Sequence, residues 1–387
     1  MPDLEARFRI VRQIPPPDLW PEIEHREPRG PQPDAPWRRL GIGAVALVMA
    51  AAGIVIAARA FLDREEGVAT QPIPRAELVG TVPFEGARGV VQGAGSLWVA
   101  AWLEGSGPSL IRMDPRSGEV IAEIPLEALT SWEINGQGVA VTPEAVWVVG
   151  GHRAAVLQRI DTASNRLVET IDLGPGHAAD VAADDTAVWV TVLRGDDFAS
   201  PEVLRVDPAT GEVVATIALA EEWARDVLIS NGYVFVHQQD VRGSGGFRES
   251  SLVRIDPGTN QVIDELPGGR WAIEALVMWE SDIWTTQGYG IRHIDPTTNS
   301  YVGQPVGVER GAPLFASGAG GLWFSGPGQD RGSVEVSRFS PSTGEVDVAV
   351  PLPRDANPVD MVVSDDDIWV VDYRGSLTQI DLRFPGR

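Results

Sequence analysis

One short pattern recurs seven times along most of this chain, and it constrains the fold more than any other feature. A single aromatic residue stands inside a strand-like apolar triplet, as in Leu97-Trp98-Val99 and Ile368-Trp369-Val370. Successive copies are 39 to 49 residues apart, and their aromatic residues are Trp98, Trp147, Trp189, Phe235, Trp284, Trp323 and Trp369. Repeats of this length indicate a solenoid, a propeller or another array of one structural unit.

A turn signature follows each aromatic residue. It reads RMDPRSGEV from Arg112, and related copies begin at Arg159, Arg205, Arg254, His293 and Arg338. In such a turn Asp accepts backbone hydrogen bonds, Pro fixes φ at the next position, and Gly or Asn adopts the left-handed conformation that closes it. An alternating segment then predicts a half-buried strand. Each copy therefore predicts four strands in about 45 residues, which is the size of a propeller blade.

The two ends of the repeat region predict how a ring would close. The seventh copy, QIDL from Gln379, ends without an outer strand, whereas the segment ELVGTVPF at 77–84 matches the outer-strand pattern and precedes the first copy. We therefore predict an all-β fold over residues 77–382, a seven-bladed propeller of four-stranded blades. Strand 77–84 is expected to complete the last blade and so remove a free sheet edge. The repeat aromatic residues are interpreted as packing between blades.

With these repeats the sequence resembles the seven-bladed propellers of the YVTN/YncE-like group, which includes the streptogramin (virginiamycin B) lyases. The segment GAGGLWFSG, Gly318 to Gly326, is similar to the lyase repeat GPDGxLWFTE. The resemblance implies the propeller fold, and in the lyases a His and a magnesium ion act on a lactone. Ser325 stands where the lyase repeat has Glu, and no catalytic His can be matched residue by residue. Propellers host unrelated functions, so the resemblance leaves the activity open.

An uncharged run from Leu40 to Ala58 precedes the propeller. As a helix it would be roughly 28 Å long, close to the thickness of the hydrocarbon core of a bilayer. We predict a transmembrane helix at 40–62 that contacts membrane lipid, followed by a linker at 63–76. Arg residues are more frequent before this run than just after it, which favours a cytoplasmic N-terminus and an extracytoplasmic propeller at the plasma membrane.

Two alternatives to the membrane span remain open: a buried helix, and a signal peptide cleaved near Ala58-Arg59-Ala60. The preceding residues 1–39 are expected to form a cytoplasmic tail that is partly disordered. Its two short helical patterns could dock on a partner, or the tail could lie on the membrane surface without order.

Composition excludes several chemistries. The chain has no Cys and its basic residues are all Arg, so thiol nucleophiles, disulfides and lysine Schiff bases are ruled out. A net charge of −23 disfavours contact with nucleic acid.

Three carboxylates occupy the same place in the expected innermost strands, nine residues before the repeat aromatic. They are Asp180, Asp226 and Asp360. Around one axis they could hold a divalent cation in the central channel through oxygen ligands. The alternative is that each Asp accepts backbone N–H bonds between blades. No other cofactor is expected.

Loops that precede the innermost strands or follow the aromatic strands should share one face. The candidate ligand-binding residues at the channel mouth are Arg88, Trp132, His177, Arg225, Trp271 and His237, with His152, Trp223 and Tyr373 also in these loops. Exposed Trp and Arg are typical binding anchors. We therefore expect a non-enzymatic domain that binds or senses an unidentified protein or small molecule. A metal-dependent lyase or hydrolase of the streptogramin-lyase type is the alternative.

Overall fold

The computed structural model describes residues 73–127, 138–195, 198–220, 223–239, 250–268, 273–288, 290–308, 314–328, 330 and 332–384. The predicted tail at 1–39, the membrane span at 40–62 and residues 63–72 of the linker lie outside these residues. Within the described ranges, no helix has the length and apolar character needed to cross a membrane.

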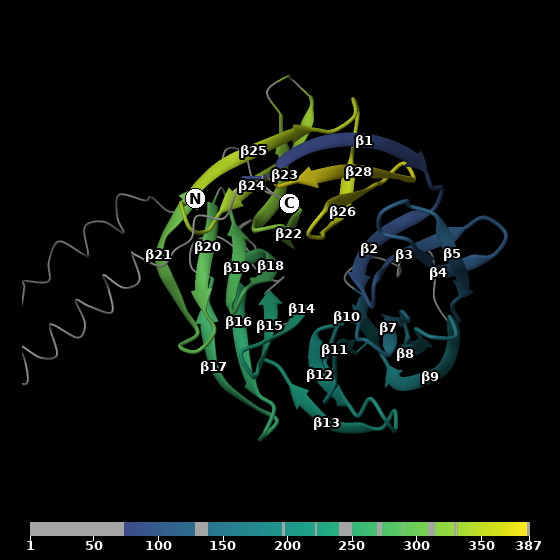
Figure 1. The fold of residues 1–387 in the computed structure, drawn as a ribbon. Coiled ribbons are helices and arrows are strands. Elements are labelled where there is room, and N and C mark those ends of the chain that lie inside the picture. The colour runs from purple at the N-terminus through teal and green to yellow at the C-terminus, as the bar shows by residue number, and fades with distance from the viewer. Residues whose placement is uncertain are drawn as a thin grey trace, which may run out of the picture. The chain divides into compact units, whose positions relative to one another are not determined.

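The described residues form 28 strands in seven four-stranded sheets, which confirms the predicted seven-bladed propeller (Figure 1). Each sheet is an antiparallel blade. From the innermost strand outward, the first three blades are β2 (Ala87–Gly93), β3 (Ser96–Leu103), β4 (Gly107–Met113) and β5 (Val120–Pro125); β6 (Val139–Val141), β7 (Ala145–Gly150), β8 (Ala154–Asp161) and β9 (Arg166–Pro175); and β10 (His177–Ala183), β11 (Val188–Arg194), β12 (Ser200–Val206) and β13 (Val213–Ala218).

Blades 4 to 7 follow the same order. Their strands are β14 (Trp223–Ser230), β15 (Tyr233–Gln239), β16 (Ser250–Asp256) and β17 (Gln261–Pro267); β18 (Ile273–Trp279), β19 (Asp282–Gln287), β20 (Gly290–Asp295) and β21 (Ser300–Gly307); β22 (Phe315–Gly318), β23 (Gly321–Pro327), β24 (Val334–Ser340) and β25 (Glu345–Pro351); and β26 (Pro358–Val363), β27 (Asp367–Asp372), β28 (Ser376–Arg383) and β1 (Arg75–Pro83).

The outer strand of blade 7 comes from the other end of the propeller sequence. β1 pairs with β28 from Arg75 opposite Arg383 to Pro83 opposite Ser376, so the strand begins two residues before the segment expected from sequence. The threonine hydroxyls of Thr81 and Thr378 are 3.0 Å apart across this pair. The innermost strands contact one another in chain order, and β2 contacts β26, so the seven blades form a closed ring.

The core lies between blades rather than within a single sheet. Each of seven buried apolar clusters combines side chains from two neighbouring blades. The repeat aromatic residue lies on the second strand of every blade and is buried in all seven, with at most 9% of its surface exposed. The interpretation of these aromatic residues as packing between blades is therefore confirmed, and burial of this apolar surface is what holds the ring together.

The turn signature folds as its chemistry predicts. Asp114 Oδ1 accepts hydrogen bonds from the backbone N–H groups of Arg116 and Ser117 at 2.9 and 2.8 Å, and these bonds lower the pKa of Asp114. The closing positions have positive φ, as at Gly118 (69°) and Asn165 (55°). Glycine and asparagine tolerate this left-handed backbone better than other residues do.

Candidate functional site

Because neighbouring strands of a blade are antiparallel, the propeller has two distinct faces. One face carries the loops between the second and third strands of each blade. It also carries the connections that lead from one blade into the innermost strand of the next, and we call it the loop face. The turns between first and second strands lie on the opposite face together with the Asp turns between third and fourth strands. We call this the turn face.

Several innermost strands have an irregularity close to the loop face. The pairing register shifts between Ala87 and Gly89 in β2, and related shifts occur in β10, β14, β18 and β26. The residues inside the shifts are Arg88, Ala179, Arg225 with Asp226, Glu274 and Val359. A β-bulge redirects the side chain that it contains. Charged residues from three blades therefore lie at the mouth of the channel, where desolvation raises the pKa of Glu274.

Arg88 contacts an exposed aromatic ring of the neighbouring blade. Its guanidinium carbon lies 5.8 Å from the ring centroid of Tyr373, which follows β27 and is 63% exposed. Trp223, at the loop-face end of β14, is 40% exposed. Large aromatic side chains and Arg are the residues that anchor protein interfaces most often. This part of the loop face therefore combines both types of anchor.

A second group on the loop face brings two imidazoles together with a phenyl ring. The ring centroids of His152 and Phe198 are 4.9 Å apart, and His177 lies 6.1 Å from each of them. His177 Nδ1 is 3.3 Å from the carbonyl oxygen of Gly151. Phe198 was not singled out from the sequence, and its positive φ of 58° is a conformation that no sequence pattern would have indicated.

The other candidate mouth residues differ in their placement. Trp132 and Trp271 lie outside the described residues. Arg225 lies in the β14 bulge, and its carbonyl oxygen is 3.4 Å from the Thr191 hydroxyl of the preceding blade. His237 is fully buried, and its Nδ1 is 2.9 Å from Asp226 Oδ2 within the same blade. Its imidazole is thus in the interior of blade 4 and not on the surface of the loop face.

Two of the three candidate metal ligands join blades through backbone N–H groups. Asp180 Oδ2 accepts from Val227 N of the next blade at 2.7 Å, and Oδ1 accepts from Val181 N at 2.7 Å. Asp360 makes the same pair of contacts, with Val90 N at 2.8 Å and Met361 N at 2.9 Å. These are the inter-blade contacts that the sequence analysis gave as the alternative to a cation site.

Desolvation opposes ionisation of both carboxyl groups, although Asp180 is buried and Asp360 is only half-buried. Desolvation and the nearby Asp226 raise the pKa of Asp180 well above its usual range, although the two backbone N–H bonds lower it. Desolvation likewise raises the pKa of Asp360 to about 7 against the opposing effect of its two N–H bonds. In the described part of the chain, no group of three or more His, Asp or Glu side chains is arranged to hold a metal ion.

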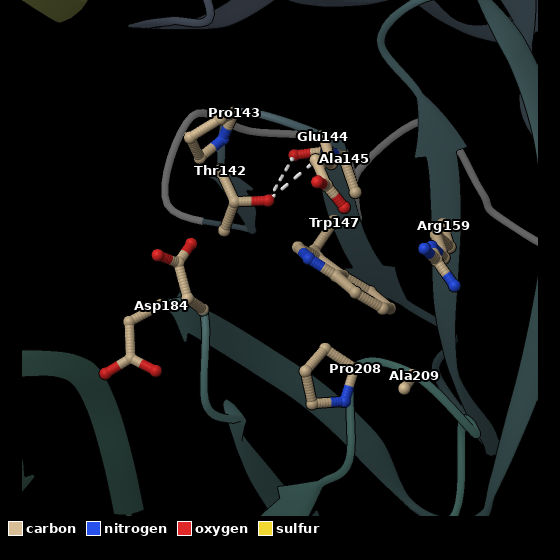
Figure 2. Close-up of a pocket in the computed structure, with 10 residues that line it drawn as sticks. Thr142, Pro143, Glu144, Ala145, Trp147, Arg159, Asp184, Pro208 and Ala209 are labelled. Atoms are coloured by element: carbon tan, nitrogen blue, oxygen red, sulfur yellow. Dashed lines mark hydrogen bonds between the residues drawn. The ribbon is translucent and has the colours of Figure 1, made fainter.

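The turn face carries a cavity of about 400 Å³ between blades 2 and 3, and sequence reasoning did not anticipate it. Figure 2 shows the indole of Trp147 in its wall, with Arg159 on one side of the ring and Asp184 on the other. The cavity is lined by Thr142, Pro143, Glu144, Ala145, Trp147, Arg159, Asp184, Asp185, Pro208 and Ala209. Three turns from two blades form it, together with the Arg that begins the turn signature of blade 2.

Comparison with known proteins supports the fold. No protein-family model matches the sequence, and no curated protein matches it. Among solved structures, virginiamycin B lyase from Staphylococcus aureus superimposes with a TM-score of 0.60 at 13% identity, over 79% of this chain and 99% of the lyase. Hydrazine synthase of Kuenenia stuttgartiensis gives 0.58 at 13% identity, over 80% and 98% of the two chains. The WD40 propeller domain of Doa1 gives 0.56 at 13% identity, over 79% and 97%. At such low identity these likenesses show that the chain has the fold of a β-propeller, and they carry no activity with them.

Proposed function

We propose that this propeller is a protein-recognition domain whose partner binds at the channel mouth on the loop face. The observation that carries the proposal is the contact between the half-buried Arg88 and the exposed Tyr373, which come from two different blades. Trp223 and the group formed by His152, His177 and Phe198 extend the same face. Propellers commonly serve as scaffolds that bind proteins, and this set of residues is typical of an interface centre.

The proposal includes the membrane anchor inferred from the sequence. The transmembrane helix predicted at 40–62 would hold the propeller outside the cytoplasm, where the loop face could meet an envelope or extracellular partner. The tail at 1–39 would then report binding to the cytoplasm. Support for this arrangement comes from the length of the run and from the uneven distribution of Arg around it.

Site-specific cross-linking in intact membranes tests the recognition site. A photoreactive amino acid at position 373 of the full chain should cross-link one partner, which mass spectrometry would identify. Once it is purified, the change Arg88→Ala should weaken its binding about 5- to 100-fold, as expected for an interface anchor. Arg116→Ala is the matched control, because Arg116 is 83% exposed on the turn face. Equal losses from the two changes would refute a site on the loop face.

The alternative activity is a metal-dependent lyase or hydrolase. The likeness to virginiamycin B lyase supports it at the level of the fold, and the neighbouring imidazoles of His152 and His177 supply groups that could act in proton transfer. Turnover of a streptogramin B lactone by the full chain with Mg²⁺ would support this alternative, provided that His177→Ala abolishes it.

A further inference from the structure

Neighbouring blades are joined on the turn face by an Arg that reaches across the joint. Arg112 of blade 1 donates hydrogen bonds to the Thr162 carbonyl oxygen and to Asn165 Oδ1 in the turn of blade 2, both at 2.7 Å. Arg205 of blade 3 repeats this contact with the Pro257 carbonyl oxygen at 2.6 Å and Asn260 Oδ1 at 3.0 Å in blade 4. At these two joints the guanidinium therefore donates to one backbone carbonyl oxygen and to one Asn side-chain oxygen.

Arg159 occupies the equivalent position in blade 2, but it makes no such contact. Its guanidinium lies over the ring of Trp147 at 5.5 Å, just as Arg112 lies over Trp98 at 5.1 Å and Arg205 over Trp189 at 5.3 Å. The stacked placement of the guanidinium is therefore retained. Within the described residues, however, the Arg159 side chain donates no hydrogen bond.

The reason lies in the turn of the next blade. That turn closes with Gly211 where the corresponding turns of blades 2 and 4 close with Asn165 and Asn260. Glycine supplies no side-chain oxygen. The space beside the guanidinium is instead the cavity of about 400 Å³, whose wall includes Arg159, Pro208 and Ala209. This volume falls in the range of small-ligand pockets.

The cavity wall also contains acidic residues. Glu144, Asp184 and Asp185 line it. Asp184 is held in place because its Oδ1 accepts the backbone N–H groups of Thr186 and Ala187 at 2.7 and 3.0 Å. Figure 2 shows that the indole of Trp147 lies between Asp184 and Arg159. A ligand that bridges the cavity therefore needs oxygen acceptors at one end and a positive charge at the other.

We propose that this cavity binds a short peptide segment of a partner, with an amide oxygen on Arg159 and a basic side chain against Glu144 and Asp185. At two other blade joints the guanidinium binds a carbonyl oxygen and an Asn amide oxygen together, and at a third Arg254 binds the carbonyl oxygens of Pro296 and Thr297. The net charge of −23 attracts basic segments to the propeller. This site is on the turn face and is independent of the recognition site proposed for the loop face.

Calorimetric titration of the full chain tests the proposal with acetyl-Asn-Gly-Lys-amide as the probe. Acetyl-Asn-Gly-Glu-amide is the charge-reversed control. The Lys peptide should bind about tenfold more tightly than the Glu peptide, and Arg159→Gln should weaken its binding about tenfold, as expected for loss of a charge-assisted hydrogen bond. Failure of the Lys peptide to bind at millimolar concentration, or equal binding by wild type and Arg159→Gln, would overturn the proposal.

A second variant separates ligand binding from joint stability. Gly211→Asn would give this turn the amide that Asn165 and Asn260 provide elsewhere, and the φ of 71° at Gly211 is one that Asn tolerates. A Cβ at this position would lie 2.7 Å from Glu169 Oε1, the end of a flexible side chain that can move. We expect the side-chain oxygen of the introduced Asn to accept a hydrogen bond from the Arg159 guanidinium. Gly211→Asn should therefore weaken peptide binding and raise the melting temperature.

Melting temperatures of two Arg variants provide a readout that needs no ligand. Arg205→Gln removes two existing inter-blade hydrogen bonds and should lower the melting temperature. Arg159→Gln removes no such bond within the described residues and loses only the stacking on an indole that both variants lose, so its melting temperature should fall less than that of Arg205→Gln. An equal fall in both variants would show that Arg159 is a structural joint residue, and the proposal would fail.

Discussion

Asp360 is the residue through which pH should act on the closure of the ring. Its carboxylate in β26 of blade 7 accepts the backbone N–H of Val90 in β2 of blade 1, so it joins the last blade to the first. Desolvation raises the pKa of Asp360 from 3.8 to about 7 in the folded protein. The folded state therefore binds a proton more tightly than the unfolded chain does.

The sign and size of the effect follow from this difference. A raised carboxyl pKa favours folding in acid, and its contribution to stability is lost as pH rises through the folded value. A pKa of about 7 against 3.8 corresponds to about 4 kcal/mol between the two limits, at 1.36 kcal/mol per unit. About 2 kcal/mol of this falls between pH 5.5 and pH 8.5, a range in which the acidic chain keeps its negative charge.

The test is urea unfolding of the wild type and Asp360→Asn at pH 5.5, 7.0 and 8.5. The Asn side-chain oxygen can still accept the N–H of Val90. The NH₂ group that takes the place of the second oxygen cannot accept the N–H of Met361, and the loss of this hydrogen bond costs about 1 kcal/mol. The difference in unfolding free energy between variant and wild type should therefore move in favour of the variant by about 2 kcal/mol across this range. Asp366→Asn is the control, because Asp366 is 54% exposed in the same blade.

Parallel pH curves for the wild type and Asp360→Asn would refute the reasoning. They would mean that the carboxyl group of Asp360 remains ionised in the folded protein throughout this range. A parallel control curve for Asp366→Asn is also required, since a shift there would show a general charge effect rather than a property of the Asp360 contact.

Three further predictions concern the anchor, the closing strand and the channel. Protease added to intact cells should cleave the propeller and leave residues 1–39 protected; cleavage of the tail alone would reverse the orientation. A chain that begins at Glu65 should unfold cooperatively, whereas one that begins at Arg88 lacks β1 and should melt at least about 5 °C lower; equal melting would contradict the role of β1. EDTA should leave the melting temperature unchanged, because Asp180 and Asp360 already accept backbone N–H groups; a fall that Ca²⁺ or Mg²⁺ reverses would establish a channel cation.

Local physical chemistry made the blade predictable from sequence. In most turns an Asp at the start, a Pro after it and the Gly or Asn that closes the turn act within a few residues of one another. The turn formed by Asp114, Arg116 and Ser117 therefore folded as expected. The repeat aromatic residues could be identified in the same way, because strand alternation fixes which side chains are buried.

The candidate site was predictable in part. The entries to the innermost strands could be placed on one face, and Arg88 and His177 lie there. The pairing of Arg88 with Tyr373 could not be derived, since the two residues are 285 positions apart and meet through closure of the ring. Asp180 and Asp226 occupy equivalent positions, yet one joins two blades and the other pairs with His237. That difference depends on which side chain the neighbouring strand presents.

The sequence by itself determined the number of blades, their turns and the aromatic residue that each blade buries, because these depend on short-range patterns repeated seven times. It did not determine what each repeated residue contacts. Arg112, Arg159 and Arg205 begin the same motif, but the partners of Arg112 and Arg205 lie in the turn of the following blade, about one repeat further along the chain. Tertiary structure alone decided that Arg112 and Arg205 hold blades together while Arg159 lines a cavity, because Gly211 leaves its guanidinium without an amide oxygen from the next blade.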